Sequence, residues 1–209
     1  LAVYGGILTI IGVIMFILQM ANTLIKQKSR NMMYYFVATA IACLSLTIIA
    51  GFLLTWSFAF GGVVNHTSIL FSHMTLGIAG WFTLLIFGFS YKLVPLFSLS
   101  HGFSMKWAKP AYFTYLAGLL ILLIAFWTVS HTLRLAGFFL LFGGFLFFAL
   151  DINEIIKKRL RKKMDKPLMF SLFAIGNGLI IHFLFLIVSI SKQTSVAVWS
   201  WLIFLYIMS

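Results

Sequence analysis

Long apolar runs separated by short polar connections follow one another along almost the whole chain. A hydrocarbon core about 30 Å thick takes roughly 20 apolar residues as a helix. Because backbone groups in lipid must be satisfied within the segment, such runs predict helices. The expected spans are Ala2–Ile25, Met33–Phe60, Thr67–Phe97, Ala111–Ser130, Thr132–Ile155, Leu168–Ile190 and, as a partial seventh, Val196–Met208. The pattern predicts an all-α, polytopic transmembrane helix bundle.

The composition agrees with a membrane protein. Of 209 residues, 63% are hydrophobic and 9% are charged, against roughly 25% charged residues in a soluble domain. The short connections predict a single transmembrane domain over residues 1–209. Since the chain begins with Leu1 and stops inside an apolar run, we expect it to be a portion of a longer polytopic protein.

The net charge of +12 raises the question of a nucleic-acid partner, but 13 of the 15 Lys and Arg residues end or follow the first, third and fifth spans, and only Arg134 and Lys192 lie on the other side. The positive-inside rule makes that side cytoplasmic and leaves Leu1 outside. The charge is therefore read as topological, with membrane lipid as the partner and no nucleic acid. The lysine-rich style indicates a bacterial cytoplasmic membrane. The basic residues on the side assigned to the cytoplasm are Lys26, Lys28, Arg30, Lys92, Lys106, Lys109, Lys157, Lys158, Arg159, Arg161, Lys162, Lys163 and Lys166.

Two of the five histidines, His73 and His182, fall within predicted spans. An ionisable side chain inside the membrane is expensive and is a functional candidate by default. Helix rise places these two at roughly 9 and 12 Å below the outer ends of their spans. Both imidazoles are thus expected at a similar level of the outer leaflet.

Small residues share a helix face with each histidine. Gly77 and Gly80 follow His73 at helical spacing, and Gly178 precedes His182 by four residues. Such stripes serve close helix packing or leave room for a flat ligand. A haem explains both features, because its iron takes axial imidazoles and its ring needs an apolar slot.

Other sites are weaker. A copper or zinc ion would use more ligands than two span histidines, although His66 and His131 in the outer loops leave that open. The alternative for each span histidine is a neutral ring hydrogen-bonded to a neighbouring helix. Asn177 either bonds across helices or faces a substrate path. Tyr91, at the end of the third span, is expected in the interfacial aromatic belt.

The segment from His73 to Phe97 resembles a pattern found in haem-copper oxidase subunit I and its outlying cbb3-like, nitric-oxide-reductase-like and NnrS-like bacterial relatives. That pattern is His-x-x-Leu-Gly-x-x-Gly-Trp, then Gly-x-x-Tyr-x-Leu-x-Pro-x-Phe. The stretch "KKRLRKKMDKPLMFSLFAIG" is similar to their basic segment and Asp-x-Pro. Matching covers about fifty residues. The resemblance implies an oxidase-like bundle holding haem b near the outer face, with His73 as an axial ligand; His182 is assigned from depth.

The sequence departs from the oxidases where their copper centre is built. It contains no His-His pair and no His-x-His, and only two span histidines. Oxygen reduction is therefore not supported, and whether the chain is an enzyme stays open. We predict a bacterial membrane haem protein for electron transfer or diatomic gas handling, with other membrane subunits or a redox partner. The competing predictions are a transporter whose proton or metal path is lined by His73, His182 and Asn177, and a non-catalytic subunit of a membrane complex.

Overall fold

The computed structural model describes residues 2–62, 65–161, 163–192 and 196–208. Six helices in this described part are long and apolar enough to cross a membrane, and one shorter apolar helix follows them. The predicted all-α polytopic bundle is confirmed, and the protein is a multi-pass integral membrane protein. The chain forms two compact units, residues 1–89 and 90–209, each described by itself.

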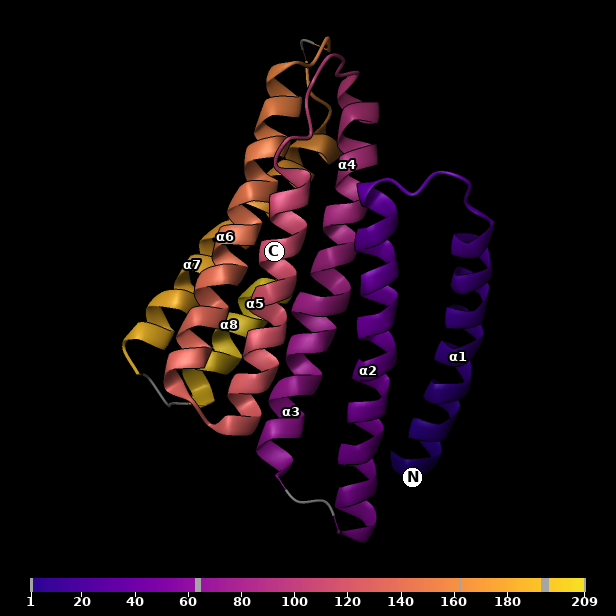
Figure 1. Cartoon of the computed structure of the whole chain (residues 1–209), viewed down its shortest axis with the longest axis vertical. Helices are drawn as coiled ribbons and strands as arrows, with labels where there is room; N and C mark the ends of the chain where they lie inside the picture. Colours follow the sequence, from indigo (N-terminus) through magenta and orange to yellow (C-terminus); the bar gives the residue numbers. More distant parts are fainter. Residues whose placement is uncertain (1, 63–64, 162, 193–195, 209) are drawn as a thin grey trace. The chain divides into compact units, whose positions relative to one another are not determined.

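The first unit is built from three helical passes (Figure 1). Helices α1 (Ala2–Lys26) and α2 (Met32–Phe60) lie side by side. The third pass is one continuous helix made of α3 (His66–Thr75), the π-helix η1 (Leu76–Thr83) and the beginning of α4 (Leu84–Ser98). Both α3 and η1 pack against α2. Asn31 caps α2, its side chain accepting a hydrogen bond from the Tyr34 amide at 3.1 Å.

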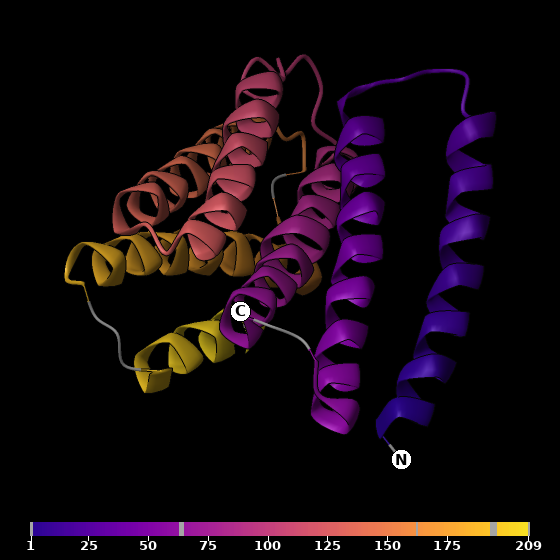
Figure 2. The ribbon, with the colours of Figure 1, turned by 60° about the horizontal axis from the view of Figure 1, so that its bottom comes forward.

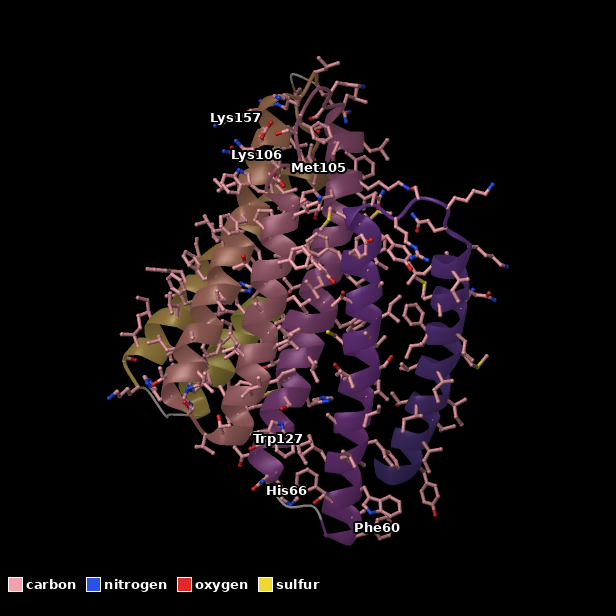
Figure 3. All side chains as sticks on the ribbon, viewed as in Figure 1. Phe60, His66, Met105, Lys106, Trp127 and Lys157 are labelled. Atoms are coloured by element: carbon pink, nitrogen blue, oxygen red, sulfur yellow. The ribbon has the colours of Figure 1, made fainter. Side chains whose placement is uncertain are left out.

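The second unit contains the end of α4 and the helices α5 (Ala108–Thr128), α6 (His131–Lys157), α7 (Lys166–Ile190) and α8 (Val196–Met208). Helices α5 and α6 form an antiparallel hairpin, and α7 crosses it at an angle (Figure 2). Lys106 and Lys157 lie at one end of this unit and Trp127 lies toward the other (Figure 3). We call these the Lys157 end and the His131 end.

Glycines set the distance between α5 and α6. A Cβ on Gly118 would lie 2.7 Å from the Leu141 amide nitrogen, and one on Gly144 would lie 2.7 Å from the Tyr115 amide nitrogen. These are backbone atoms, so no side chain can swing aside. The two helices therefore cross at a distance that only glycine permits.

Two helices begin earlier than the sequence predicts, and each has proline in its first turn. Helix α5 starts at Ala108 rather than Ala111, ahead of Pro110, and α7 starts at Lys166 rather than Leu168, ahead of Pro167. Proline lacks an amide hydrogen, but the first-turn amides have no intrahelical partner anyway. Proline therefore lies inside these helix starts instead of preceding them.

Candidate functional site

His73 lies on α3 with its imidazole against α2. Its Nδ1 is 2.8 Å from the carbonyl oxygen of Thr47. A carbonyl only accepts, so Nδ1 carries the proton and Nε2 holds the lone pair. Within the described part of the chain, Nε2 forms no hydrogen bond. His73 is thus an oriented imidazole, and in its neutral form Nε2 is still available as a ligand.

Gly51 of α2 makes this orientation sterically feasible. A Cβ at Gly51 would lie 2.8 Å from Cε1 and 3.1 Å from Nδ1 of His73. Any side chain there would push the ring away from the Thr47 carbonyl. Neither Thr47 nor Gly51 belongs to a recognisable motif, so no feature of the sequence identifies them as partners of His73.

The helix changes its hydrogen-bond pattern directly after His73. Residues Leu76–Thr83 form a π-helix, and the Thr83 hydroxyl donates to the Ile78 carbonyl five residues earlier, at 2.8 Å. Stretches of π-helix are rare and occur frequently at functional sites. The segment "LGIAGWFT" also contains Gly77 and Gly80, whose missing side chains ease a widened turn.

The glycine stripe that continues from His73 packs against α2. A Cβ on Gly77 would lie 3.3 Å from Cγ2 of Thr47, and one on Gly88 would lie 3.1 Å from Cβ of Phe36. Gly80 is buried. At these positions the small residues serve close helix packing, the first of the two uses that the sequence allowed.

His182 lies on α7 and has partners for both ring nitrogens. Its Nδ1 donates to the Gly178 carbonyl at 2.8 Å, so Nε2 is the acceptor of the Tyr115 hydroxyl at 3.1 Å. The rings of Phe145 and Tyr206 lie 4.5 and 5.3 Å from the imidazole, between centroids. The side chain is buried at 6% exposure. His182 is therefore a neutral ring bonded to a neighbouring helix, the structural alternative left open by the sequence.

Two glycines build the surroundings of His182. Gly144 of α6 allows the backbone of Tyr115 to approach, which brings the hydroxyl within reach of α7. A Cβ on Gly178 would lie 2.8 Å from Cζ of Phe145, so the ring of Phe145 fills the space beside Gly178. The structure thus brings Gly178 and His182 together as predicted, but with an aromatic side chain in the space proposed for a flat ligand.

The histidines therefore differ in their fitness to hold haem iron. His73 meets the usual requirement of a histidine ligand, with one nitrogen donating to a carbonyl and the other holding a lone pair. His182 meets it only if the Tyr115 hydroxyl leaves Nε2. His73 belongs to the first unit and His182 to the second, so each fit is judged within its own unit.

The described residues offer no group of three or more His, Cys, Asp or Glu side chains that could hold a metal ion. His66 and His131, predicted in loops, are the first residues of α3 and α6 and have other partners: His66 bonds to the Ser57 hydroxyl, and His131 bonds to the Ser189 carbonyl at 2.9 Å. The half-buried amide of Asn177 has no hydrogen-bond partner among the residues that the structure describes.

A buried acid at the Lys157 end was not recognised from the sequence as a structural centre. Asp151 of α6 is fully buried and accepts hydrogen bonds from the Tyr91 hydroxyl at 3.1 Å and the Trp107 amide at 3.2 Å. Tyr91 is 6% exposed, so its assignment to the interfacial aromatic belt is wrong. An aspartate inside an apolar run is itself the signal, because a buried carboxylate needs donors.

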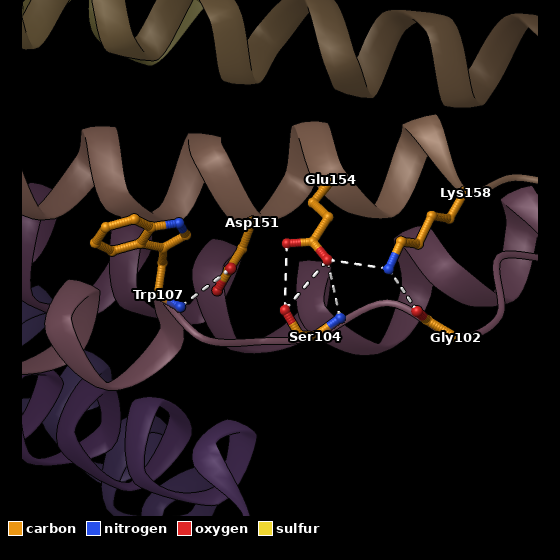
Figure 4. A network of polar contacts seen from close by, with 6 residues as sticks. All are labelled: Gly102, Ser104, Trp107, Asp151, Glu154 and Lys158. Carbon is orange, nitrogen blue, oxygen red and sulfur yellow. Dashed lines mark hydrogen bonds and ion pairs between the residues drawn. The ribbon is translucent and has the colours of Figure 1, made fainter.

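One turn after Asp151, Glu154 binds the connection that precedes α5 through Ser104 (Figure 4). Its carboxylate accepts from the Ser104 amide at 3.1 Å and from the Ser104 hydroxyl, and it pairs with Lys158 at 3.3 Å. The Lys158 ammonium also donates to the Gly102 carbonyl at 2.6 Å. Together with Asp151, these contacts hold the connection onto the end of α6.

No family model, curated protein or solved structure matches the chain.

Proposed function

We propose that this integral membrane protein is a haem protein in which Nε2 of His73 would hold the haem iron. The observation that carries the proposal is the 2.8 Å contact between Nδ1 of His73 and the Thr47 carbonyl. That contact fixes the tautomer and leaves the lone pair on Nε2. The same arrangement orients and strengthens metal-bound histidines in general.

Two further features support His73. Gly51 leaves room for the oriented ring, and the helix changes to a π-helix directly after His73, as is frequent at functional sites. A neutral imidazole is also the form that a membrane interior favours, since a charged one is costly there.

His182 is not assigned as a second iron ligand, although the sequence predicted a His73–His182 pair. His182 would have to give up the Tyr115 hydroxyl, so we assign His73 alone. When bound, a haem b would supply a one-electron centre and a binding place for a gas such as O2 or NO. Single ligation favours gas handling, whereas a second ligand from a partner subunit would favour electron transfer.

We also propose a bacterial cytoplasmic membrane as the location, with the Lys157 end in the cytoplasm. Thirteen of the fifteen Lys and Arg residues fall on the side that the positive-inside rule assigns to the cytoplasm. A reporter that works only in the cytoplasm should therefore be active when fused after residue 161. A reporter that works only in the periplasm should be inactive at the same position.

The test is a reduced-minus-oxidised visible spectrum of the full chain purified from haem-supplied membranes. We expect a haem b spectrum that is lost in His73→Gly and partly restored by added imidazole, because a free imidazole can occupy the vacated position. A merely structural histidine would not be rescued in this way. His101→Gly, in a connection, is the matched control and should keep the spectrum.

Other outcomes point elsewhere. A spectrum that survives His73→Gly would overturn the assignment of the ligand. A colourless preparation that carries stoichiometric metal would favour the transporter class, in which His73, His182 and Asn177 line a path. A colourless, metal-free preparation would favour a non-catalytic subunit.

A further inference from the structure

The His131 end of the second unit gathers basic groups around one backbone oxygen. The carbonyl of Ser189, near the end of α7, accepts hydrogen bonds from Nε2 of His131 at 2.9 Å and from the amide of Lys192 at 3.3 Å. Arg134 follows His131 by three residues and so lies on the same face of α6. These contacts bring the start of α6 and the end of α7 together, and with them Arg134 and Lys192.

Two buried hydrogen-bonding groups at this place lack a partner within the described ranges. They are Nε of Arg134 and the hydroxyl of Ser189, a residue that is 1% exposed. A buried polar group left unpaired costs roughly 1–3 kcal/mol, and more when it is charged. Both groups can donate, so both are suited to an external acceptor.

No acid of this chain can neutralise Arg134. The three acids are Asp151, Glu154 and Asp165, and they lie at the opposite end of the unit. Asp151 follows Arg134 on α6 by 17 residues, which is roughly 26 Å of helix. A half-buried guanidinium whose Nε has no partner among the described residues is therefore suited to bind an anion from outside the chain.

We propose that Arg134, the Ser189 hydroxyl and Lys192 bind the phosphate of an anionic phospholipid. Guanidinium groups match phosphate oxygens in a bidentate geometry. Arg134 lies within the first turn of α6, at the level where a transmembrane helix enters the headgroup region. Phe139 of α6 and Ile187 and Ile190 of α7 are 62%, 44% and 55% exposed, which provides apolar surface for acyl chains on these two helices.

The apolar surface selects a lipid over a free phosphate ion. A membrane phospholipid already lies against exposed apolar side chains such as Phe139 and Ile190, so its phosphate is held at the level of Arg134, whereas a free ion has no such placement. The site involves neither His73 nor His182 and stands independently of the haem proposal.

The experiment measures lipid binding to the purified full chain by native mass spectrometry, with phosphatidylglycerol as the probe. We expect Arg134→Gln to weaken binding about tenfold or more, as for a lost hydrogen bond to a charged group. Lys157→Gln, at the opposite end, is the matched control and should leave this binding event unchanged. Equal binding to wild type and Arg134→Gln would overturn the proposal.

A second variant guards against a simple folding defect. Ser189→Ala removes the unpaired hydroxyl, so the lipid-free protein should unfold at the same temperature or higher. Stabilisation by phosphatidylglycerol should nevertheless decrease. Lipid stabilisation equal to wild type would contradict the role of Ser189. Inorganic phosphate alone is the remaining arm; displacement of the lipid by millimolar phosphate would assign the site to a free anion and overturn the lipid assignment.

Discussion

The crossing of α5 and α6 provides a sharp test of the packing described above, because adjacent glycines on α6 face different surroundings. A Cβ on Gly144 would lie 2.7 Å from the Tyr115 amide nitrogen and 2.8 Å from its Cα, whereas a Cβ on Gly143 would meet only Cγ2 of Thr114, at 3.7 Å. The first contact requires the helices to separate, and the second is an ordinary van der Waals contact.

The two Gly→Ala changes alter the free energy of unfolding equally through helix propensity and differ in the interhelical contacts that the new Cβ makes. Each gains up to about 1 kcal/mol of helix propensity. Gly144→Ala adds an overpacking cost of about 1–3 kcal/mol and weakens the interhelical bond from Tyr115 to His182, about 0.6 kcal/mol by analogy with other membrane proteins. We therefore expect Gly144→Ala to be less stable than Gly143→Ala by roughly 2–4 kcal/mol.

The assay is reversible unfolding in mixed micelles, with helical circular dichroism followed as the fraction of sodium dodecyl sulfate rises. If the two variants unfold at the same fraction of denaturing detergent, the close crossing is refuted. A double-mutant cycle with Tyr115→Phe adds a second check. Because Gly144→Ala already displaces Tyr115, removing the hydroxyl should cost less in that background than in the wild type.

Three further changes follow from the buried contacts. Tyr115→Phe leaves Nε2 of His182 without its donor and should destabilise the protein by about 0.5–2 kcal/mol in the same unfolding assay. Asp151→Asn keeps one acceptor and should destabilise the protein less than Asp151→Leu. The leucine leaves the Tyr91 hydroxyl and the Trp107 amide without an acceptor, at a cost of about 1–3 kcal/mol each. Thermal unfolding of the two variants measures the difference. Gly51→Ala should displace the ring of His73 and shift or weaken the proposed haem spectrum.

Each of these changes has a specific contradiction. Equal stability of Tyr115→Phe and wild type would mean that the hydroxyl finds no acceptor in the folded protein. Asp151→Leu at wild-type stability would show that the connection before α5 is not held by this carboxylate. For Gly51→Ala the control is Gly12→Ala, whose Cβ would meet nothing within 4 Å; equal spectra in both variants would remove Gly51 from the ligand site.

The spans were predictable because a bilayer imposes one length on every crossing helix, and Met33–Phe60 differs from the observed Met32–Phe60 by one residue. The π-helix was not, because its apolar pattern resembles that of an α-helix. The close crossing of α5 and α6 does have a signal in the sequence. Gly137 and Gly144 are seven residues apart on α6, two turns along one face, which is typical of close helix approach.

Depth and residue type made His73 and His182 look alike, and the neighbours of their ring nitrogens make them different. In each ring, Nδ1 donates to a backbone carbonyl, so the lone pair of the neutral ring lies on Nε2. The other nitrogen then decides the chemistry. Tyr115 occupies it in His182, and that tyrosine is in place only because Gly144 lets α5 approach α6. A ligand role for a histidine in a membrane helix is therefore decided by the packing of neighbouring helices, which the sequence around the histidine does not specify.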